Sequence, residues 1–241
     1  MQGKSGQHRR EASVSGAALL GGSFNPLHFG HLRLAVEVFE ALRPERLEFV
    51  PCANPPHKRR EKLLPFALRY AMLREALAAC PHFQVNPLEA EMPAPSFTCA
   101  MLRAYRERHD GTRLYFILGS EDFSGLDSWK DWRELPRLAT LVVAARQGGD
   151  KDEFRSAVRR FWPEAEGAEE WPDAGDEPAF VLPGGGKVSY LPLPRLDINA
   201  SLLRARWLAG RSIDFFTPDA VLEFLDRQAD TVRAYWGSDP R

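Results

Sequence analysis

The stretch that decides the fold is residues 21–31, which read Gly-Gly-Ser-Phe-Asn-Pro-Leu-His-Phe-Gly-His. A short apolar run, Ala17–Leu20, comes immediately before it and is typical of a buried strand. After it, apolar residues recur at positions 32, 35, 36, 39 and 42, which is the spacing of one helical face. The sequence therefore predicts a strand, a glycine loop and a helix in direct succession.

This succession suits phosphate binding. Glycines let the backbone turn tightly and approach a ligand, and a helix start offers N–H groups and a partial positive charge. His28 and His31 lie three residues apart at the junction, so they share one face of the first turn. Imidazoles there suit a reaction in which negative charge builds on phosphate oxygens. A glycine loop before a helix is common, however, and histidines also cap helices, so the loop alone leaves a structural role open.

The composition narrows the class of protein. The chain has 241 residues, which suits one α/β domain or one such domain with an appendage. A net charge of −1 argues against holding nucleic acid through bulk charge. Cys52, Cys80 and Cys99 lack the spacing of metal ligands, which favours a reducing cytoplasm over a disulfide framework.

The N-terminal segment Met1–Ser15 is polar and basic, without the apolar run of a signal peptide or a membrane anchor. We expect residues 1–15 to be a disordered tail. No apolar stretch reaches the about 18 residues that a membrane span needs. The sequence thus predicts a cytoplasmic protein with neither nucleic acid nor a membrane as its partner, and it leaves the oligomeric state open.

The most basic patch of the chain is His57-Lys58-Arg59-Arg60, which follows the second predicted strand, Leu47–Val50. A run of charges is usually a solvated loop. This run, however, lies directly after a strand of what we predict to be a parallel sheet, and ligands gather at the carboxyl ends of such strands. The position favours an anion-binding loop.

Further elements follow from apolar spacing and from breaker residues. The predicted strands are Phe83–Val85, Leu114–Leu118, Thr140–Ala145 and Lys187–Leu191. The predicted helices are Pro65–Ala79, a helix capped by Ser96 that ends near Arg108, Lys151–Phe161, one that begins near Asp197, and Pro218–Arg227.

Polar and aromatic side chains follow the strand Leu114–Leu118. Glu121 and Asp122 either accept hydrogen bonds from ribose hydroxyls or cap the next turn. Of Trp129 and Trp132, we expect one to belong to the core and the other to stack on a flat ring.

A second helix start resembles the first in its chemistry. Asn199 or Ser201 caps it, and Arg204 follows about one turn later. A hydroxyl and an arginine at a helix start form a phosphate site by the same physics as the glycine loop. Arg204 and Arg206 are equally compatible with plain surface positions.

These elements form one domain over residues 16–228. Residues 148–186 differ in character, and the acidic stretch Glu164–Pro178 is typical of a mobile loop. Residues 229–241 are expected to be a C-terminal tail.

The loop Ser23-Phe24-Asn25-Pro26 with the following His28-Phe29-Gly30-His31 resembles the signature of the nucleotidylyltransferase superfamily. Four more stretches are similar to bacterial nicotinate-nucleotide adenylyltransferases: Pro51 with Pro55–Lys58, Ser96–Thr98, Gly119 with Trp129, and Ile198–Arg204. The chain departs from the family pattern at Asn25, Glu121 and Asn199, where aspartate, aspartate and serine are usual.

This resemblance implies a Rossmann-like α/β fold, a parallel sheet with helices on both faces and a small C-terminal helical part. It also implies the reaction of ATP with nicotinate mononucleotide to give deamido-NAD and pyrophosphate. The nucleophile is then a phosphate oxygen of the mononucleotide, so neither a protein nucleophile nor a general base is needed. Mg²⁺ is expected on the ATP phosphates, held largely through water, with no metal ligands from the protein.

The resemblance also assigns roles to residues. The catalytic set is His28, His31 and Arg204. The ATP-binding set is Gly21, Gly22, Ser23, Phe24, Ser201 and Glu121. The mononucleotide-binding set is Lys58, Thr98, Trp129 and Arg146.

Two alternatives remain open. One is an adenylyltransferase of the same fold that acts on nicotinamide mononucleotide or another phosphate acceptor. The other is a nucleotide-binding regulator without turnover.

Overall fold

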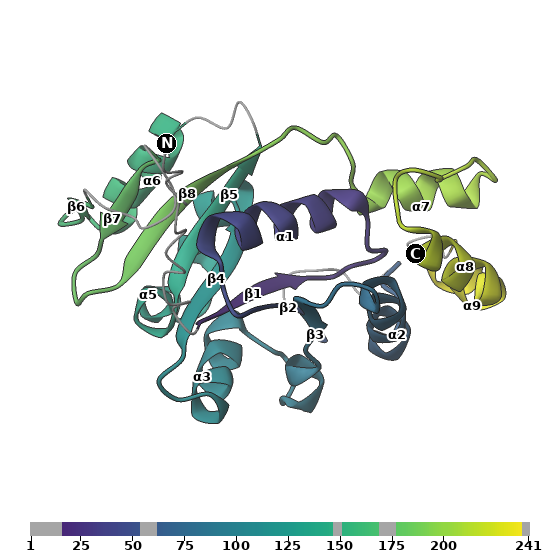
Figure 1. Cartoon of the computed structure of the whole chain (residues 1–241), viewed down its shortest axis with the longest axis horizontal. Coiled ribbons are helices and arrows are strands. Elements are labelled where there is room, and N and C mark those ends of the chain that lie inside the picture. The colour runs from purple at the N-terminus through teal and green to yellow at the C-terminus, as the bar shows by residue number, and fades with distance from the viewer. Residues whose placement is uncertain (1–15, 54–61, 147–150, 169–176, 238–241) are drawn as a thin grey trace, which may run out of the picture.

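The computed structural model describes residues 16–53, 62–146, 151–168 and 177–237, without the side chain of residue 146 (Figure 1). The predicted N-terminal tail and the basic loop at residues 57–60 lie outside the described residues.

A single mixed sheet forms the centre of the described structure, and its strands are β1 (Gly16–Gly22), β2 (Arg46–Pro51), β3 (Phe83–Val85), β4 (Arg113–Gly119), β5 (Thr140–Arg146), β6 (Glu166–Gly167), β7 (Ala179–Val181) and β8 (Lys187–Leu193). Their order is β3-β2-β1-β4-β5-β8-β7-β6. The first six strands in this order run parallel, and β7 and β6 extend the edge as antiparallel strands. The parallel Rossmann-like sheet is therefore confirmed, with an antiparallel extension inside residues 148–186.

The principal helices are α1 (Phe29–Leu42), α2 (Phe66–Leu77), α3 (Thr98–Arg108), α4 (Ser120–Ser124), α5 (Leu135–Leu138), α6 (Lys151–Phe161), α7 (Ala200–Leu208), α8 (Asp219–Arg227) and α9 (Ala229–Trp236). Short 3₁₀ turns, η1 (Leu88–Glu91), η2 (Leu126–Ser128) and η3 (Trp132–Glu134), lie before α3 and between α4 and α5.

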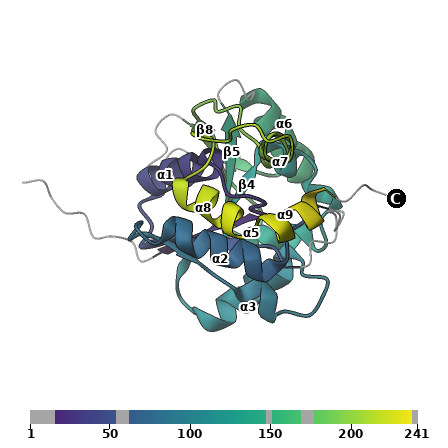
Figure 2. The same ribbon diagram turned by 90° about the vertical axis from the view of Figure 1, so that its right-hand side faces the viewer.

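The helices cover both faces of the sheet, as predicted. Helices α1, α2, α8 and α9 share one apolar core with the sheet, and α3, α5 and α6 share the other. Figure 1 shows α1 above the sheet and α3 below it, with α8 beside α2 at the right-hand side of the view, and Figure 2 shows α8 in front when the molecule is seen from that side. Alternate residues of the central strands serve the two cores, so the unbroken apolar run of β4 is buried on both sides.

Three local predictions were wrong. Helix α1 starts at Phe29 and buries Val38 rather than Val36, because its buried face follows the actual start of the helix. Ser96 is buried and does not cap α3, whose N-cap position is Phe97.

The third error concerns the predicted C-terminal tail. Residues Ala229–Trp236 form α9 instead, and the Trp236 side chain is fully buried. Apolar residues of α9 at helical spacing complete the core beneath α7, where the ring centroids of Trp207 and Trp236 lie 5.4 Å apart. Over the described parts of the chain, no helix combines the length and the apolar character that crossing a membrane requires.

Candidate active site

The loop between β1 and α1 is held tightly by its own side chains. Phe24 is fully buried and adopts a φ of 45°, and its ring packs 5.0 Å from the ring of His31. A Cβ added to Gly22 would lie 2.9 Å from the Phe24 ring, so glycine is needed there for close packing. The loop therefore presents the start of α1 in a fixed position.

The two histidines lie together at that start. His28 is the N-cap residue of α1, and its ring stacks on the ring of His31 with centroids 3.7 Å apart. His28 is buried and His31 is partly exposed. The first N–H of α1, that of Phe29, donates to the Phe216 carbonyl at 2.9 Å, which ties this helix end to the C-terminal part.

Gly30 makes the packing of His28 possible. A Cβ at this position would lie 2.9 Å from His28 Nδ1 and 3.4 Å from the Ile198 carbonyl. We expect Gly30→Ala to push the His28 ring aside and lower the turnover of the enzyme about tenfold or more, because small displacements of aligned groups are costly in catalysis. Gly167→Ala is the matched control, since nothing lies within 4 Å of a Cβ there. Steady-state kinetics of both variants test this, and equal turnover would contradict it.

The second predicted phosphate site is the start of α7. Asn199 is its N-cap residue, and the Asn199 side chain accepts the Leu202 N–H at 2.9 Å. Arg204 Nη2 donates to Ser201 Oγ at 2.9 Å, so the guanidinium and the hydroxyl lie side by side. Burial lowers the pKa of Arg204 below its ordinary value. The guanidinium still carries its charge at neutral pH, because arginine is not deprotonated in proteins.

Arg204 also joins the start of α7 to the loop before α1. Its Nη1 donates to the backbone carbonyl of Asn25 at 2.8 Å. The Asn25 side chain is held in turn by two segments, the stretch before α2 and the last helix: its Nδ2 donates to the Lys62 carbonyl at 2.6 Å, and its Oδ1 accepts the Leu64 N–H at 3.2 Å and Trp236 Nε1–H at 3.1 Å. The sequence marked Asn25 only as a departure from a family pattern, and its part in joining these segments comes from long-range contacts.

A cavity of about 700 Å³ opens beside the histidines. It is lined by the start of α1, including His28 and His31, by Gly119–Asp122 at the end of β4, and by the connection from Leu193 to Ala200. Glu121 thus lines the same cavity as the two histidines. Arg33 and Arg195 also line it and were missed, although Arg195 follows directly after the carboxyl end of β8.

The other predicted ATP residues do not line this cavity, but they are near its lining residues in the sequence. Gly21 and Gly22 end β1, and Ser23 and Phe24 follow them in the loop. Ser201 lies one residue beyond the lining residue Ala200.

Two of the segments predicted for the mononucleotide, those of Thr98 and Trp129, lie together on the face of the sheet that α3 covers. Thr98 begins α3, and Trp129 is half-buried against Phe116, with ring centroids 6.5 Å apart. Their chain neighbours are in contact, because Lys130 Nζ lies 4.8 Å from the centre of the Phe97 ring. Trp132 is the tryptophan of the core, as one of the pair was expected to be. Residue 146 ends β5, its side chain is not described, and Lys58 lies outside the described residues.

Comparisons with known proteins agree with this arrangement. Residues 19–206 match the cytidylyltransferase-like family. The chain is 37% identical over 211 residues to the "Probable nicotinate-nucleotide adenylyltransferase" of Syntrophotalea carbinolica, an alignment that covers 87% of this chain and 94% of the relative. It is 30% identical over 220 residues to the protein of the same name from Maridesulfovibrio salexigens, which covers 90% of this chain and 98% of the relative.

The fold is also similar to solved structures. Plasmodium falciparum nicotinic acid mononucleotide adenylyltransferase complexed with NaAD matches with a TM-score of 0.65 and 17% identity, over 90% of this chain and 97% of that one. The same protein complexed with APC matches with a TM-score of 0.62. At this identity the likeness shows the fold alone, whereas the family match and the sequence relatives extend through both helix starts of the site. The chain therefore belongs to the cytidylyltransferase-like family and, within it, to the nicotinate-nucleotide adenylyltransferases.

Proposed function

We propose that this protein transfers the adenylyl group of ATP to nicotinate mononucleotide, giving deamido-NAD and pyrophosphate, with the two joined helix starts as the phosphate site. The observation that carries the proposal is the bond of 2.8 Å between Arg204 and the Asn25 carbonyl, which brings α7 against the loop before α1. Two helix N-termini, two imidazoles and a guanidinium at one place suit a polyphosphate.

In this reaction a phosphate oxygen of the mononucleotide attacks the α-phosphorus of ATP, and the bond from that phosphorus to the oxygen of the leaving pyrophosphate breaks. The attacking oxygen is already ionised, so the protein has to align the groups and stabilise the developing charge. We assign the stabilisation of that charge to His28 and His31 at the start of α1. Ser201 and Arg204 are assigned to the β- and γ-phosphates.

The cavity of about 700 Å³ suits the adenosine part of ATP. Its volume falls within the range of about 300–1,000 Å³ that is usual for small-molecule sites. Glu121 is assigned to the ribose hydroxyls, and Gly21, Gly22, Ser23 and Phe24 to the wall nearest the phosphates. Lys58, Thr98, Trp129 and Arg146 are assigned to the mononucleotide.

Mg²⁺ is proposed to enter as part of the substrate MgATP. Among residues that the structure describes, no group of three or more His, Cys, Asp or Glu side chains is placed to hold a metal ion. A cation that is bound mainly by phosphate oxygens and water needs no such group of protein ligands, and it neutralises charge on the phosphates. We further propose that the reaction takes place in the cytoplasm, in keeping with three free cysteines.

The test of this function is a comparison of the acid and amide acceptors. We expect nicotinate mononucleotide to be preferred over nicotinamide mononucleotide about tenfold or more. The two differ in one group, and a site with N–H donors for both carboxylate oxygens leaves the amide NH₂ facing a donor, which costs about 1–3 kcal/mol. The measurement is kcat/KM for both acceptors, with pyrophosphate release as the readout.

Trp129→Ala separates affinity from discrimination in the same assay. Stacking on Trp129 involves the ring that both acceptors share, so the variant should weaken both while preserving their ratio. A wild-type ratio near one, or an amide preference, would favour the alternative acceptor. Absence of pyrophosphate release with ATP and either acceptor would favour a regulator without turnover.

A further inference from the structure

Among the described residues, three buried charged side chains lie outside the set of residues assigned above: Glu48, Arg69 and Glu89, of which the last two form a pair. Arg69 on α2 is 1% exposed and Glu89 in the turn η1 is 8% exposed. Burial lowers the pKa of Arg69 and raises the pKa of Glu89, so both charges are costly to bury. Their mutual attraction offsets part of that cost. Such a pair requires an explanation, because apolar residues of similar volume often give equal or greater stability.

The Arg69 guanidinium spans the carboxyl ends of β1 and β2. Its Nη1 donates to the Ser23 carbonyl at 2.9 Å and its Nη2 to the Cys52 carbonyl at 2.7 Å. Its Nε donates to the Leu64 carbonyl at 2.8 Å, just before its own helix. One side chain therefore fixes the nucleotide loop after β1 and the segment after β2, where these two neighbouring strands part.

The Glu89 carboxylate continues this connection to α3. Its Oε2 accepts the Ala53 N–H at 3.0 Å and the Ser96 hydroxyl at 2.7 Å. Ala53 leads from β2 into the basic loop, and Ser96 lies two residues before Thr98. Both bonds thus end on segments that we assign to the mononucleotide.

We propose that Arg69 and Glu89 are positioning residues that fix the distance between the ATP loop and the mononucleotide segments. The inference rests on the proposed function. Its physical reason is that in-line transfer needs the attacking phosphate and the α-phosphorus to be aligned, and these two groups are held by different loops. All the bonds given above for Arg69 and Glu89 end on those loops or on the segment leading into α2. They couple Ser23 to Ser96 through the two side chains and the Cys52–Ala53 backbone that lies between them.

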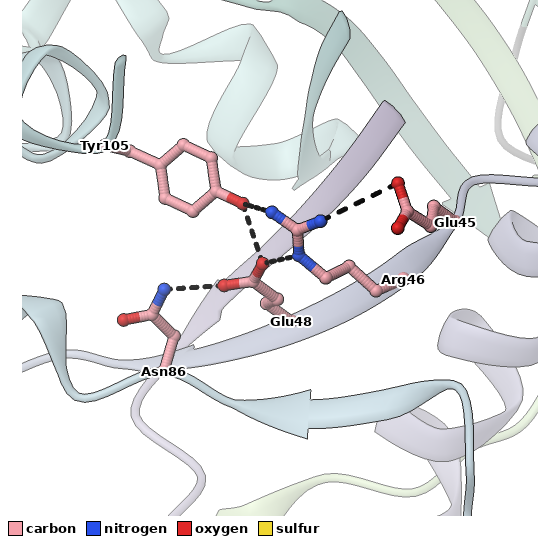
Figure 3. Close-up of polar contacts among 5 residues, drawn as sticks. All are labelled: Glu45, Arg46, Glu48, Asn86 and Tyr105. Carbon is pink, nitrogen blue, oxygen red and sulfur yellow. Dashed lines mark hydrogen bonds and ion pairs between the residues drawn. The ribbon is translucent and has the colours of Figure 1, made fainter. Parts of the chain in front are cut away.

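Strand β2, which leads into Cys52 and Ala53, also carries Glu48, a second buried glutamate that serves as a matched control for Glu89. Figure 3 shows the cluster of Arg46, Glu48, Asn86 and Tyr105, of which Arg46 and Glu48 lie in the first half of β2. Glu48 is 4% exposed and accepts from Arg46 Nε at 2.6 Å, Tyr105 Oη–H at 2.7 Å and Asn86 Nδ2 at 2.5 Å. Burial and this bond to Glu48 raise the pKa of Tyr105. It is a buried charged network of the same kind, but its bonds end on Arg46, Asn86 and Tyr105 rather than on the loop after β1, on Ala53 or on Ser96.

The experiment compares Glu89→Gln with Glu48→Gln in the full chain. We expect Glu89→Gln to lower kcat about 10- to 100-fold, the range expected for hydrogen bonds to a charged group, and to raise the KM for nicotinate mononucleotide. The dissociation constant of ATP alone should stay within about twofold, because Arg69 still holds Ser23. We expect Glu48→Gln to lower the Tm about as much as Glu89→Gln does. Its kcat and both of its KM values should nevertheless stay within about twofold of wild type.

Ser96→Ala provides a milder variant if Glu89→Gln fails to fold. It removes one of the Glu89 bonds and keeps the charge pair, so we expect about a three- to tenfold lower kcat with nearly unchanged thermal stability. Wild-type kinetics in folded Glu89→Gln or Ser96→Ala, or equal kinetic losses in Glu89→Gln and Glu48→Gln, would overturn the inference. Failure of the proposed function shows separately, as wild-type protein without adenylyl transfer.

Discussion

Replacing His31 by alanine should lower kcat about 10²–10³-fold, which is the usual cost of losing one group that stabilises transition-state charge. His31 stacks on His28 at the α1 start, with ring centroids 3.7 Å apart, and lies beside the 700 Å³ cavity. Under the proposed function, its ring is assigned to the charge that develops on the transferred phosphate. Binding of the mononucleotide is assigned to other loops, so its KM should change little.

The control for this variant is His82→Ala. His82 is an exposed histidine that stacks on Phe39, with ring centroids 4.7 Å apart. Phe39 lies in the last turn of α1, whereas His31 lies in its first turn. Single-turnover rates of both variants with saturating ATP and nicotinate mononucleotide separate chemistry from product release. A His31→Ala enzyme that keeps more than about half of the wild-type rate would refute a role in charge stabilisation.

Replacing Arg204 by alanine should raise the KM for ATP and lower kcat, with a combined loss in kcat/KM of about 10²-fold or more. A hydrogen bond to a charged group is worth about 1.5–3 kcal/mol, and this guanidinium is expected to serve the phosphates as well as its protein partners. The variant also removes the bond of 2.8 Å to the Asn25 carbonyl, so the two helix starts lose their link.

Arg206 supplies a control two residues further along the same helix. Its Nε donates to the Ser212 carbonyl at 2.9 Å, and its guanidinium lies 5.5 Å from the centre of the Phe216 ring. These contacts serve the turn after α7, so Arg206→Ala should cost some thermal stability without changing the kinetics toward ATP. Equal kinetic effects of the two substitutions would mean that the phosphate register of α7 has been misassigned.

Local patterns in the sequence predicted the parts of the fold that depend on local physics. The strand, loop and helix around His28 and His31 are confirmed because glycine spacing and helical periodicity act over a few residues. The unbroken apolar run of β4 likewise predicted a strand buried on both faces. Glu121 lies just after the carboxyl end of β4, and it lines the cavity. Once that strand is recognised in the sequence, its carboxyl end is an expected place for a ligand site.

Residues that act over long range could not be predicted in this way. Arg69 lies among apolar residues of α2 and is buried, since three backbone carbonyls from separate segments surround it. Ser96 suited an N-cap by its residue type, but its hydroxyl is taken by Glu89, seven residues earlier. α9 was missed because its polar residues resemble a tail, and only its apolar positions, Val232 and Trp236, complete the core.

The bond between Trp236 and Asn25 has a consequence for how this enzyme comes into being. The two residues are 211 positions apart. At about 5–20 residues per second, Asn25 is synthesised about 10–40 s before the indole that bonds to its side chain. Strand β1, which leads into this loop, likewise waits for its partner β4 (Arg113–Gly119). We therefore expect a chain cut before α9 to lack both the indole bond to Asn25 and the core contacts of Val232 and Trp236, so that a change at the end of the sequence alters the loop near its start.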